Sequence, residues 1–319
     1  MSVRPRANSA RPAVLPAGLP AATEAPARLR VGAVGAGRVG AVLGAALSAA
    51  GHEVVAASGV SAASAERAAR LLPGVPLLPA DEVVAASDLV VLAVPDDTLA
   101  GLVAGLAETG AWRRGQLLFH TSGAHGLAAL LPAERRGVLT LALHPAMTFS
   151  GAPEDAARLA AAPFGVTSRP EHRPVAETLV LEMGGEPFWI DEADRGLYHL
   201  ALVTGANHLV TLVAEAADLL RAAGVHEPAR VLTPLLTAAL DNGLRRGDRG
   251  LTGPVSRGDV GTVAAHLDTL AERAPAAVDA YVALARRTTE RALATGRLKR
   301  HEGAPLLDLL SGSPEEAAR

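Results

Sequence analysis

The feature that most constrains this chain is a glycine-rich turn between two short apolar runs. Leu29–Val34 is apolar and short, as expected for a buried parallel strand, and the hexapeptide Gly35-Ala36-Gly37-Arg38-Val39-Gly40 follows it directly. A small-residue helix is expected over Val39–Ala50, and a second apolar strand over Glu53–Ala57. The turn therefore lies in a strand–helix–strand unit of about thirty residues, the context in which a G-x-G-x-x-G pattern indicates a dinucleotide site.

Each glycine of this turn has a separate physical reason. Gly35 permits the tight turn, Gly37 lets a pyrophosphate approach the backbone, and Gly40 lets the helix pack closely on the strand. The helix N-terminus offers N–H groups and a partial positive charge to the phosphates. We therefore predict that the cofactor is bound by Gly35, Ala36, Gly37, Arg38, Val39 and Gly40. The alternative is a purely structural turn, since the chain has 32 glycines.

The end of the second strand indicates which dinucleotide is bound. NAD-binding units usually carry a carboxylate there for the ribose 2′-hydroxyl, but this chain has Ser58-Gly59-Val60-Ser61. Hydroxyls at Ser58 and Ser61 and the cation of Arg67 suit a 2′-phosphate instead. We predict NADP, with NAD as the alternative; in that case Ser61 would only cap the following helix and Arg67 would be solvated.

Composition limits the chemistry and the partners. A chain of 319 residues with 49% hydrophobic residues can bury one large or two ordinary domains. Its formal net charge of -3 makes nucleic acid an unsuitable partner. There is no cysteine, so disulfides and thiolate chemistry are excluded, and Lys299 is the only lysine. The proline-rich stretch Met1–Arg28 predicts a disordered tail without a signal sequence, and hence a cytoplasmic protein.

The order of apolar segments predicts two domains. Strands alternate with helices over residues 29–190, which predicts a doubly wound parallel sheet. Further strands are expected at Val75–Leu78, Asp88–Val94, Gln116–Thr121, Val138–Leu143, Pro163–Ser168 and Pro187–Ile190. Residues 191–319 read as an all-helical domain for substrate binding and dimerisation. Its long apolar segment Leu197–Ala223 carries polar residues, which favours a buried core helix over a membrane span. We also predict a homodimer, because long apolar helices in this domain need covering.

Polar residues follow several predicted strands at the edge where such sheets bind ligands. Val94 and Pro95 end one strand and are expected to lie against the cofactor. His120 and His144 end two others, and His199 lies on the long helix; with lysine nearly absent, these three histidines are the candidate proton donors. Asn207 and Ser122 would orient the substrate. The alternatives are turn or core histidines, a capping serine and a satisfied core asparagine.

A second polar turn, 251–259, is rich in glycine and proline. Thr252, Arg257 and Asp259 are predicted to bind substrate there, with Arg257 holding a carboxylate. The alternative is a surface pair of Arg257 and Asp259, with Ser256 capping a helix. No cluster of histidines and carboxylates has metal-ligand spacing, so no metal is predicted.

These motifs together carry a family resemblance. VGAVGAGRVG (31–40), DLVVLAVPDD (88–97), HTSG (120–123), LALHPAMTF (141–149), YHLALVTGANHLVTL (198–212) and LTGPVSRGD (251–259) resemble the bacterial Rossmann-like oxidoreductases with a C-terminal domain of unknown function 2520. That family is similar in layout to β-hydroxyacid dehydrogenases, ketopantoate reductases and pyrroline-5-carboxylate reductases. The resemblance implies NADP-linked hydride transfer and a helical domain that often dimerises. One departure is that Val203 stands where the first two relatives have a proton-donating lysine, one turn before the asparagine.

The sequence therefore predicts a reductase that transfers a hydride between NADP and a small carboxylated carbonyl, hydroxy acid or imine. One alternative is ketopantoate reduction, against which the missing lysine argues. Another is a dinucleotide-binding sensor or scaffold without turnover.

Overall fold

The computed structural model describes residues 28–312, so the predicted disorder of residues 1–27 lies outside the described part. The chain divides into two compact units, the first ending at Leu200 and the second beginning at Ala201. Composition had placed the boundary slightly earlier, near Asp191.

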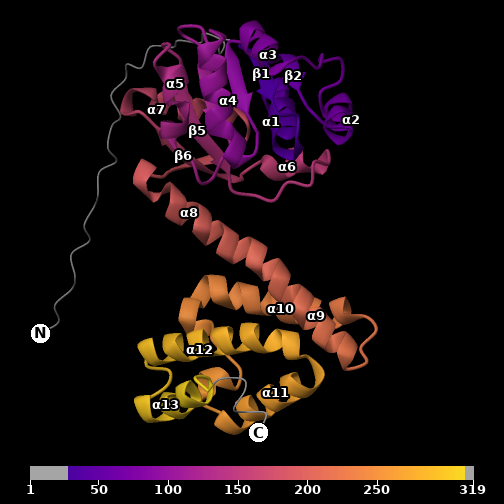
Figure 1. Ribbon diagram of the computed structural model, residues 1–319, viewed down its shortest axis with the longest axis vertical. Coiled ribbons are helices and arrows are strands. Elements are labelled where there is room, and N and C mark those ends of the chain that lie inside the picture. The colour runs from indigo at the N-terminus through magenta and orange to yellow at the C-terminus, as the bar shows by residue number, and fades with distance from the viewer. Residues whose placement is uncertain (1–27, 313–319) are drawn as a thin grey trace, which may run out of the picture. The chain divides into compact units, whose positions relative to one another are not determined.

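The first unit is built around a seven-stranded sheet with the order β2-β1-β3-β4-β5-β6-β7 (Figure 1). Its strands are β1 (Arg30–Val34), β2 (Glu53–Ser58), β3 (Leu89–Leu92), β4 (Leu117–His120), β5 (Leu139–Pro145), β6 (Pro163–Ser168) and β7 (Glu186–Trp189). All neighbouring strands are parallel except β5 and β6. The predicted doubly wound α/β fold is thereby confirmed, with one antiparallel pair that the sequence pattern did not indicate.

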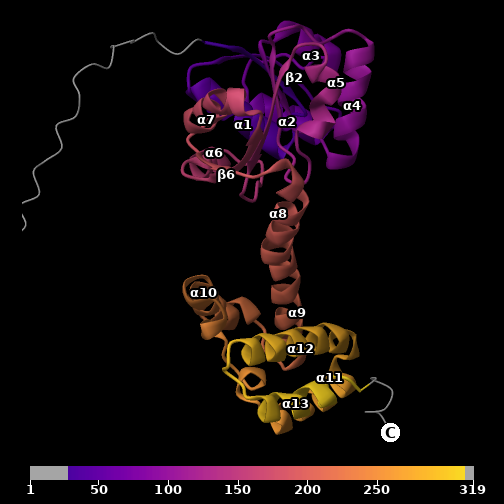
Figure 2. The same ribbon diagram turned by 90° about the vertical axis from the view of Figure 1, so that its left-hand side faces the viewer.

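Helices cover both faces of this sheet (Figures 1 and 2). One face packs against α1 (Arg38–Ala49), α6 (Glu154–Leu159) and α7 (Arg173–Glu182). The other packs against α3 (Ala80–Ala86), α4 (Asp96–Glu108) and α5 (Leu131–Glu134), while α2 (Ala62–Leu71) packs beside α1. Successive residues of β3 alternate between the two cores, so a fully buried apolar strand needs hydrophobic side chains at every position.

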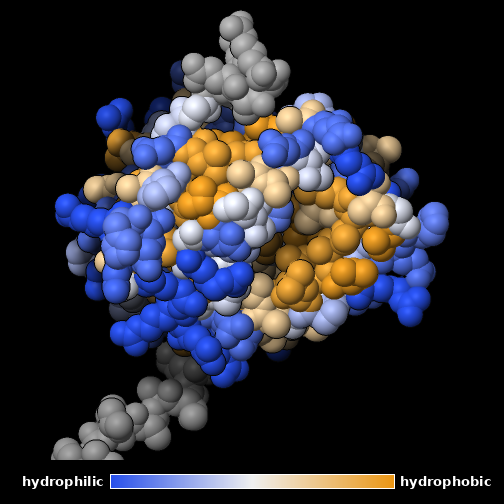
Figure 3. All heavy atoms as spheres, turned by 90° about the horizontal axis from the view of Figure 1, so that it is seen from below, coloured by the Kyte–Doolittle hydropathy of each residue, from blue (hydrophilic) through white to orange (hydrophobic). Residues whose placement is uncertain are grey.

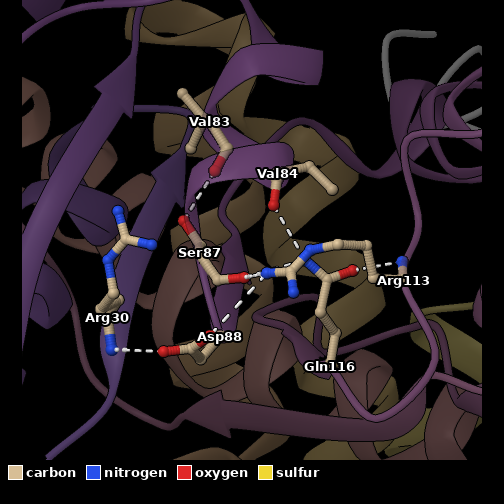
Figure 4. Close-up of polar contacts among 7 residues, drawn as sticks. All are labelled: Arg30, Val83, Val84, Ser87, Asp88, Arg113 and Gln116. Carbon is tan, nitrogen blue, oxygen red and sulfur yellow. Dashed lines mark hydrogen bonds and ion pairs between the residues drawn. The ribbon is translucent and has the colours of Figure 1, made fainter.

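The amino ends of β3 and β4 are held by a compact polar cluster (Figure 4). The carbonyl oxygen of Ser87 accepts hydrogen bonds from Arg113 Nη2 at 2.6 Å and from Gln116 Nε2 at 2.9 Å. The hydroxyl of Ser87 donates to the Val83 carbonyl at 2.6 Å. Because this cluster lies at the opposite end of the strands from the glycine-rich turn, we assign it a structural role.

The second unit is helical. It contains α9 (His208–Ala222), α10 (Pro228–Arg246), α11 (Val260–Arg273), α12 (Val278–Ala294) and α13 (Arg300–Leu309). Its small core is formed by Val263, Ala285, Ala292, Leu298, Leu306 and Leu310. Figure 3, which looks onto this unit, shows apolar surface gathered beside a hollow. The helical carboxyl-terminal region is thus confirmed, but much of its apolar surface is uncovered.

The long apolar helix differs from expectation in two ways. The segment is α8 (Arg195–Leu202), a π-helical stretch over Val203–Asn207, and then α9. The helical run Glu192–Ala222 is long and apolar enough to cross a membrane, yet none of its most apolar window is buried. The prediction of a buried core helix was therefore wrong, because the unit has too few partners to cover this element. The π turn also invalidates positions inferred from a regular helical period.

The strand predicted at Val75–Leu78 does not form in the structure. Val75–Leu78 contributes only a single bridge, between Leu77 and Ala57. Two prolines flank this short run, at Pro73 and Pro79, and Pro76 lies inside it, so it cannot donate the hydrogen bonds of a full ladder.

Candidate cofactor site and the histidines beside it

The glycine-rich turn has the geometry that its sequence predicts. Gly35 has φ +97°, a conformation that side chains disfavour. A Cβ atom on Gly40 would collide with the carbonyl oxygen of Gly35, whereas one on Gly37 would meet nothing closer than 4.0 Å. Gly40 is therefore required for packing, while Gly37 leaves an open space beside the backbone.

The N-terminus of α1 is uncapped. Gly37 is its N-cap residue, no side chain accepts from the first-turn N–H groups, and no acidic residue lies in that turn. Such an N-terminus favours an anion. Ser58 supports the turn from β2: its hydroxyl accepts from Gly35 N at 3.2 Å, and its carbonyl accepts from Ala36 N at 2.6 Å.

Three arginine side chains converge around Gly151, in the segment between β5 and α6. A Cβ atom on Gly151 would lie 2.5 Å from Arg67 Nε and 2.9 Å from Arg38 Cγ. Arg70 Nη2 donates to the Gly151 carbonyl at 2.7 Å. Within residues 28–312, none of the three forms an ion pair with a carboxylate, and Arg67 Nε is buried without a hydrogen-bond partner. The three guanidinium groups therefore gather positive charge around Gly151, whose N–H is hydrogen-bonded to the buried carboxylate of Asp155.

Ser61 and the residues after β3 have local roles in the structure. The hydroxyl of Ser61 caps α2 by accepting from Ser64 N at 3.1 Å. Pro95 is the N-cap residue of α4, and the Val94 side chain lies against Gly35. Val94 thus borders the glycine-rich turn, as the sequence predicts, while Ser61 makes the capping bond of the alternative interpretation.

His120 is locked in place by the loop that follows β4. Its ring is fully buried, and its Nδ1 accepts from Ser122 N at 3.2 Å, which leaves Nε2 to donate to the Gly126 carbonyl at 3.0 Å. Burial lowers the pKa of His120 to about 4. With both ring nitrogens occupied, His120 is a poor proton donor, and we remove it from the three candidates. Ser122 is also engaged, since its hydroxyl accepts from His125 N at 3.0 Å.

His144 and His199 lie close together and share a third partner, Tyr198. His144 Nδ1 and the Tyr198 hydroxyl are 2.7 Å apart, and the rings of His144 and His199 have centroids 6.5 Å apart. A Cβ atom on Gly123 would lie 2.8 Å from His199 and 3.1 Å from His144 Nε2. These three side chains therefore meet at the carboxyl ends of β4 and β5, all within the first unit.

Sequence reasoning missed Tyr198 and Arg195. Arg195 is 1% exposed and donates to three backbone carbonyls: His125 at 2.8 Å, Gly165 at 3.0 Å and Ser122 at 3.2 Å. Burial lowers its pKa. One signal could have identified Tyr198: the chain has 2 tyrosines, and this one is adjacent to a candidate histidine. Nothing in the sequence marks Arg195, because its acceptors are backbone atoms.

The remaining candidates belong to the second unit. Asn207 ends the π-helical stretch and is exposed. Asp259 caps α11 by accepting from Thr262 N at 3.0 Å, so the capping residue is Asp259 and not Ser256. Thr252 lines a cavity of about 280 Å³, and Arg257 is exposed. Substrate binding by these four residues stays a prediction.

The fold and the turn define a dinucleotide-binding α/β protein with a helical carboxyl-terminal unit. Two family models match separate parts of the chain: a Rossmann-like domain matches residues 19–145, and the domain of unknown function DUF2520 matches residues 162–288. The resemblance drawn from the sequence motifs is confirmed. No curated protein matches the chain.

Solved structures share this fold at low identity. BF3122 from Bacteroides fragilis, proposed to be an NADP oxidoreductase, is 24% identical with a TM-score of 0.68, covering 82% of this chain and 98% of its own. Protein TM1727 from Thermotoga maritima is 21% identical with a TM-score of 0.59, covering 83% and 99%. An imine reductase from Pseudomonas sp. is 19% identical with a TM-score of 0.55, covering 89% and 93%. The chain thus has the fold of dinucleotide-dependent oxidoreductases.

Proposed function

We propose that this protein is an NADP-dependent oxidoreductase that transfers a hydride between the nicotinamide and a small carboxylated carbonyl, hydroxy acid or imine. The observation that carries the proposal is the open, uncapped N-terminus of α1 behind Gly37, next to arginines without carboxylate partners. The pyrophosphate would bind at the helix N-terminus. The nicotinamide would extend toward the carboxyl ends of β4 and β5.

The arginine cluster supports NADP over NAD. A ribose 2′-phosphate needs cationic partners, whereas a 2′-hydroxyl needs a carboxylate acceptor. Arg38 and Arg67 can supply the cationic partners of a 2′-phosphate. The end of β2 at Ser58 has no carboxylate that could accept from a 2′-hydroxyl. The Arg67 side chain is partly exposed and forms no ion pair with a carboxylate among residues 28–312, so its guanidinium is available to such a phosphate.

Titration with both cofactors tests this part of the proposal. We expect NADPH to bind at least about tenfold more tightly than NADH, and Arg67→Gln to remove most of that difference, since a hydrogen bond to a charged group is worth about 1.5–3 kcal/mol. Arg135→Gln, which removes an exposed arginine of the same unit, is the control and should leave both affinities unchanged. Equal affinities in the wild-type protein would make the 2′-phosphate site wrong, and binding of neither nucleotide would overturn the function itself.

The proposed substrates include both small carboxylated carbonyl compounds and imines. Structures named imine reductases share the fold, which favours including imines among the substrates. Turnover of NADPH should be measured with a panel of keto acids, ketopantoate among them, and cyclic imines. Tight NADPH binding without turnover across the panel would favour the dinucleotide sensor instead.

We further propose that the protein is a cytoplasmic homodimer whose helical units supply the interface. Apolar side chains of α9, α10 and α12 are exposed at 37–79%: Leu209, Val210, Leu212, Leu219, Val231, Leu235, Leu240, Leu244 and Leu284. Exposed apolar surface of this extent is typical of an oligomer interface. A second copy of the chain would cover it without any membrane.

A further inference from the structure

Tyr198 and His144 form a hydrogen-bonded pair beside the expected position of the nicotinamide. The Tyr198 ring lies over Gly165 of β6, where a Cβ atom would be 2.7 Å from the phenolic oxygen, and its centroid is 5.8 Å from that of Phe188. The Tyr198 hydroxyl oxygen and His144 Nδ1 are 2.7 Å apart, an ordinary hydrogen-bond distance for a hydroxyl group. Both side chains are therefore fixed in orientation.

The other ring nitrogen of His144 is available. His144 Nε2 has no hydrogen-bond partner among the described residues, and this atom is not fully buried. It points toward Gly123, the glycine of the turn after β4, where a side chain would come within 3.1 Å of it. A side chain at position 123 would crowd Nε2, so the glycine keeps this nitrogen clear for contact with a ligand atom.

Burial, together with the nearby charges, keeps both groups of the pair neutral. His144 faces Arg195, Tyr198 and His199 from α8 and Asp96 from α4. Burial, with help from Arg195 and His199, lowers the pKa of His144 to about 4, and burial raises the pKa of Tyr198 to about 12. At neutral pH both groups are thus uncharged, and an imidazolium is not the resting state.

We propose that His144 is a catalytic residue that delivers a proton to the substrate oxygen from Nε2 as a neutral imidazole, while Tyr198 replaces that proton at Nδ1. This inference rests on the proposed function and names a carbonyl compound as the substrate class that the pair serves. A carbonyl needs a proton at oxygen when it is reduced, whereas a protonated iminium becomes an amine without one.

Hydride addition to the substrate is coupled to two proton transfers, and all the groups involved lie in this site. Hydride from the reduced nicotinamide adds to the carbonyl carbon, and the carbon–oxygen π pair moves onto oxygen. The Nε2 proton passes to that oxygen while the Tyr198 hydroxyl proton passes to Nδ1, so that neither imidazolate nor imidazolium forms. The product is an alcohol and a phenolate, and the buried Arg195 cation stabilises the phenolate. After the product leaves, Nε2 takes a proton from water while the Nδ1 proton returns to the phenolate, which restores the starting tautomer. A simple alkoxide is a stronger base than a phenolate of pKa about 12, so the transfer is downhill.

Kinetics of Tyr198→Phe test the relay. We expect kcat for keto acids to fall at least about 10²-fold, the usual scale for loss of a proton-transfer group, with KM and NADPH affinity changed less than about threefold. Reduction of a cyclic iminium should change less than about threefold. The wild-type kcat should be flat from about pH 5.5 to pH 9, whereas a histidinium donor with an ordinary pKa would lose activity above about pH 6.5.

The chain provides a matched control. Tyr281 is the other tyrosine, and its hydroxyl is likewise hydrogen-bonded to a histidine, His266 Nδ1, at 2.8 Å in the helical unit. Tyr281→Phe removes the same kind of bond and should leave kcat within about twofold. An equal loss in both variants would mean that the effect of Tyr198→Phe is structural, and would overturn the relay.

A readout independent of turnover separates the two proposals. Nitrogen-15 spectra of the histidine rings, assigned with His144→Gln, should show His144 neutral at pH 7 with the proton on Nε2, and Tyr198→Phe should shift its Nδ1 signal. A charged ring or a proton on Nδ1 overturns the relay whatever the activity. Turnover of keto acids with Tyr198→Phe as fast as wild type overturns the relay alone, and no turnover on any substrate overturns the proposed function and the relay with it.

Discussion

Gly37 and Gly40 lie three positions apart, but packing within the protein requires only one of them to be glycine. Gly40 allows α1 to approach the turn, and any Cβ there would collide with the Gly35 carbonyl. Gly37 has an ordinary φ of −73° and open space around its Cα, so packing does not require it. A glycine at position 37 is explained if a ligand, such as the cofactor pyrophosphate, approaches the backbone there.

This difference gives a paired prediction at the scale of single residues. Gly40→Ala should lower the free energy of unfolding by about 1–3 kcal/mol, the usual cost of overpacking. Gly37→Ala should leave stability nearly unchanged but weaken NADPH binding at least about tenfold, because the methyl group occupies the pyrophosphate position. Urea denaturation and fluorescence titration measure the two effects. Undiminished NADPH binding by Gly37→Ala would contradict the placement of the phosphates.

The sequence predicts the roles of residues that local backbone geometry requires, but it does not predict roles that depend on partners far away in the chain. The roles of Gly35 and Gly40 follow from backbone geometry that the spacing of the motif already requires. The engagement of His120 depends on where the carbonyl of Gly126 lies in space. Arg195 likewise acts through backbone oxygens of segments distant in sequence. Such partners are set by the tertiary fold.

At the scale of elements, the loop between β5 and α6 connects the two halves of the sheet. Asp155 is fully buried and accepts from Ser150 N and Gly151 N, both at 2.7 Å. Burial raises the pKa of Asp155, but the hydrogen bonds from Gly151 and Ser150 outweigh it, so that the net pKa lies below 3.8. Through Arg70 and Gly151 this loop is tied to α2.

Asp155→Asn should therefore destabilise the protein in a pH-dependent way. Since the folded pKa of Asp155 is depressed, its contribution is complete above the unfolded value near pH 4 and is lost as the pH falls through the folded value. We expect a loss of about 1–3 kcal/mol at pH 7 that shrinks in acid below pH 4, measured by urea denaturation. Glu154→Gln removes the same charge from the exposed neighbouring position and should have little effect. Equal losses at pH 7 and in acid would show that the charge of Asp155 is irrelevant.

The long helical segment shows how an element can be recognised while its environment is misjudged. Its length and apolar character were evident from the sequence, and the helix is present. Composition alone does not reveal whether an apolar side chain packs inside the unit or remains on its surface. The π turn at Val203–Asn207 also escapes a periodicity argument, because it inserts an irregular turn that contains Gly205 but no proline.

At the scale of the whole molecule, the uncovered apolar side chains of the helical unit predict association. Val210 on α9 is 69% exposed and Leu244 on α10 is 79% exposed. We expect light scattering to give about twice the chain mass of 32.4 kDa, and the double variant Val210→Glu/Leu244→Glu to give the mass of one chain. Leu181→Glu, at a 57% exposed position on α7, is the control and should not change the mass. A monomeric wild-type protein would contradict this proposal.

The sequence by itself determined the dinucleotide-binding unit, the alternation of strands and helices, and the helical character of the second half. These features depend on local periodicity, on glycine geometry and on the short range of helix and strand hydrogen bonds. Only the tertiary structure decided that β6 runs antiparallel to β5, that His120 is locked by its loop, and that Tyr198 is hydrogen-bonded to His144. Those outcomes depend on contacts between residues far apart in the chain, whose approach no local pattern encodes.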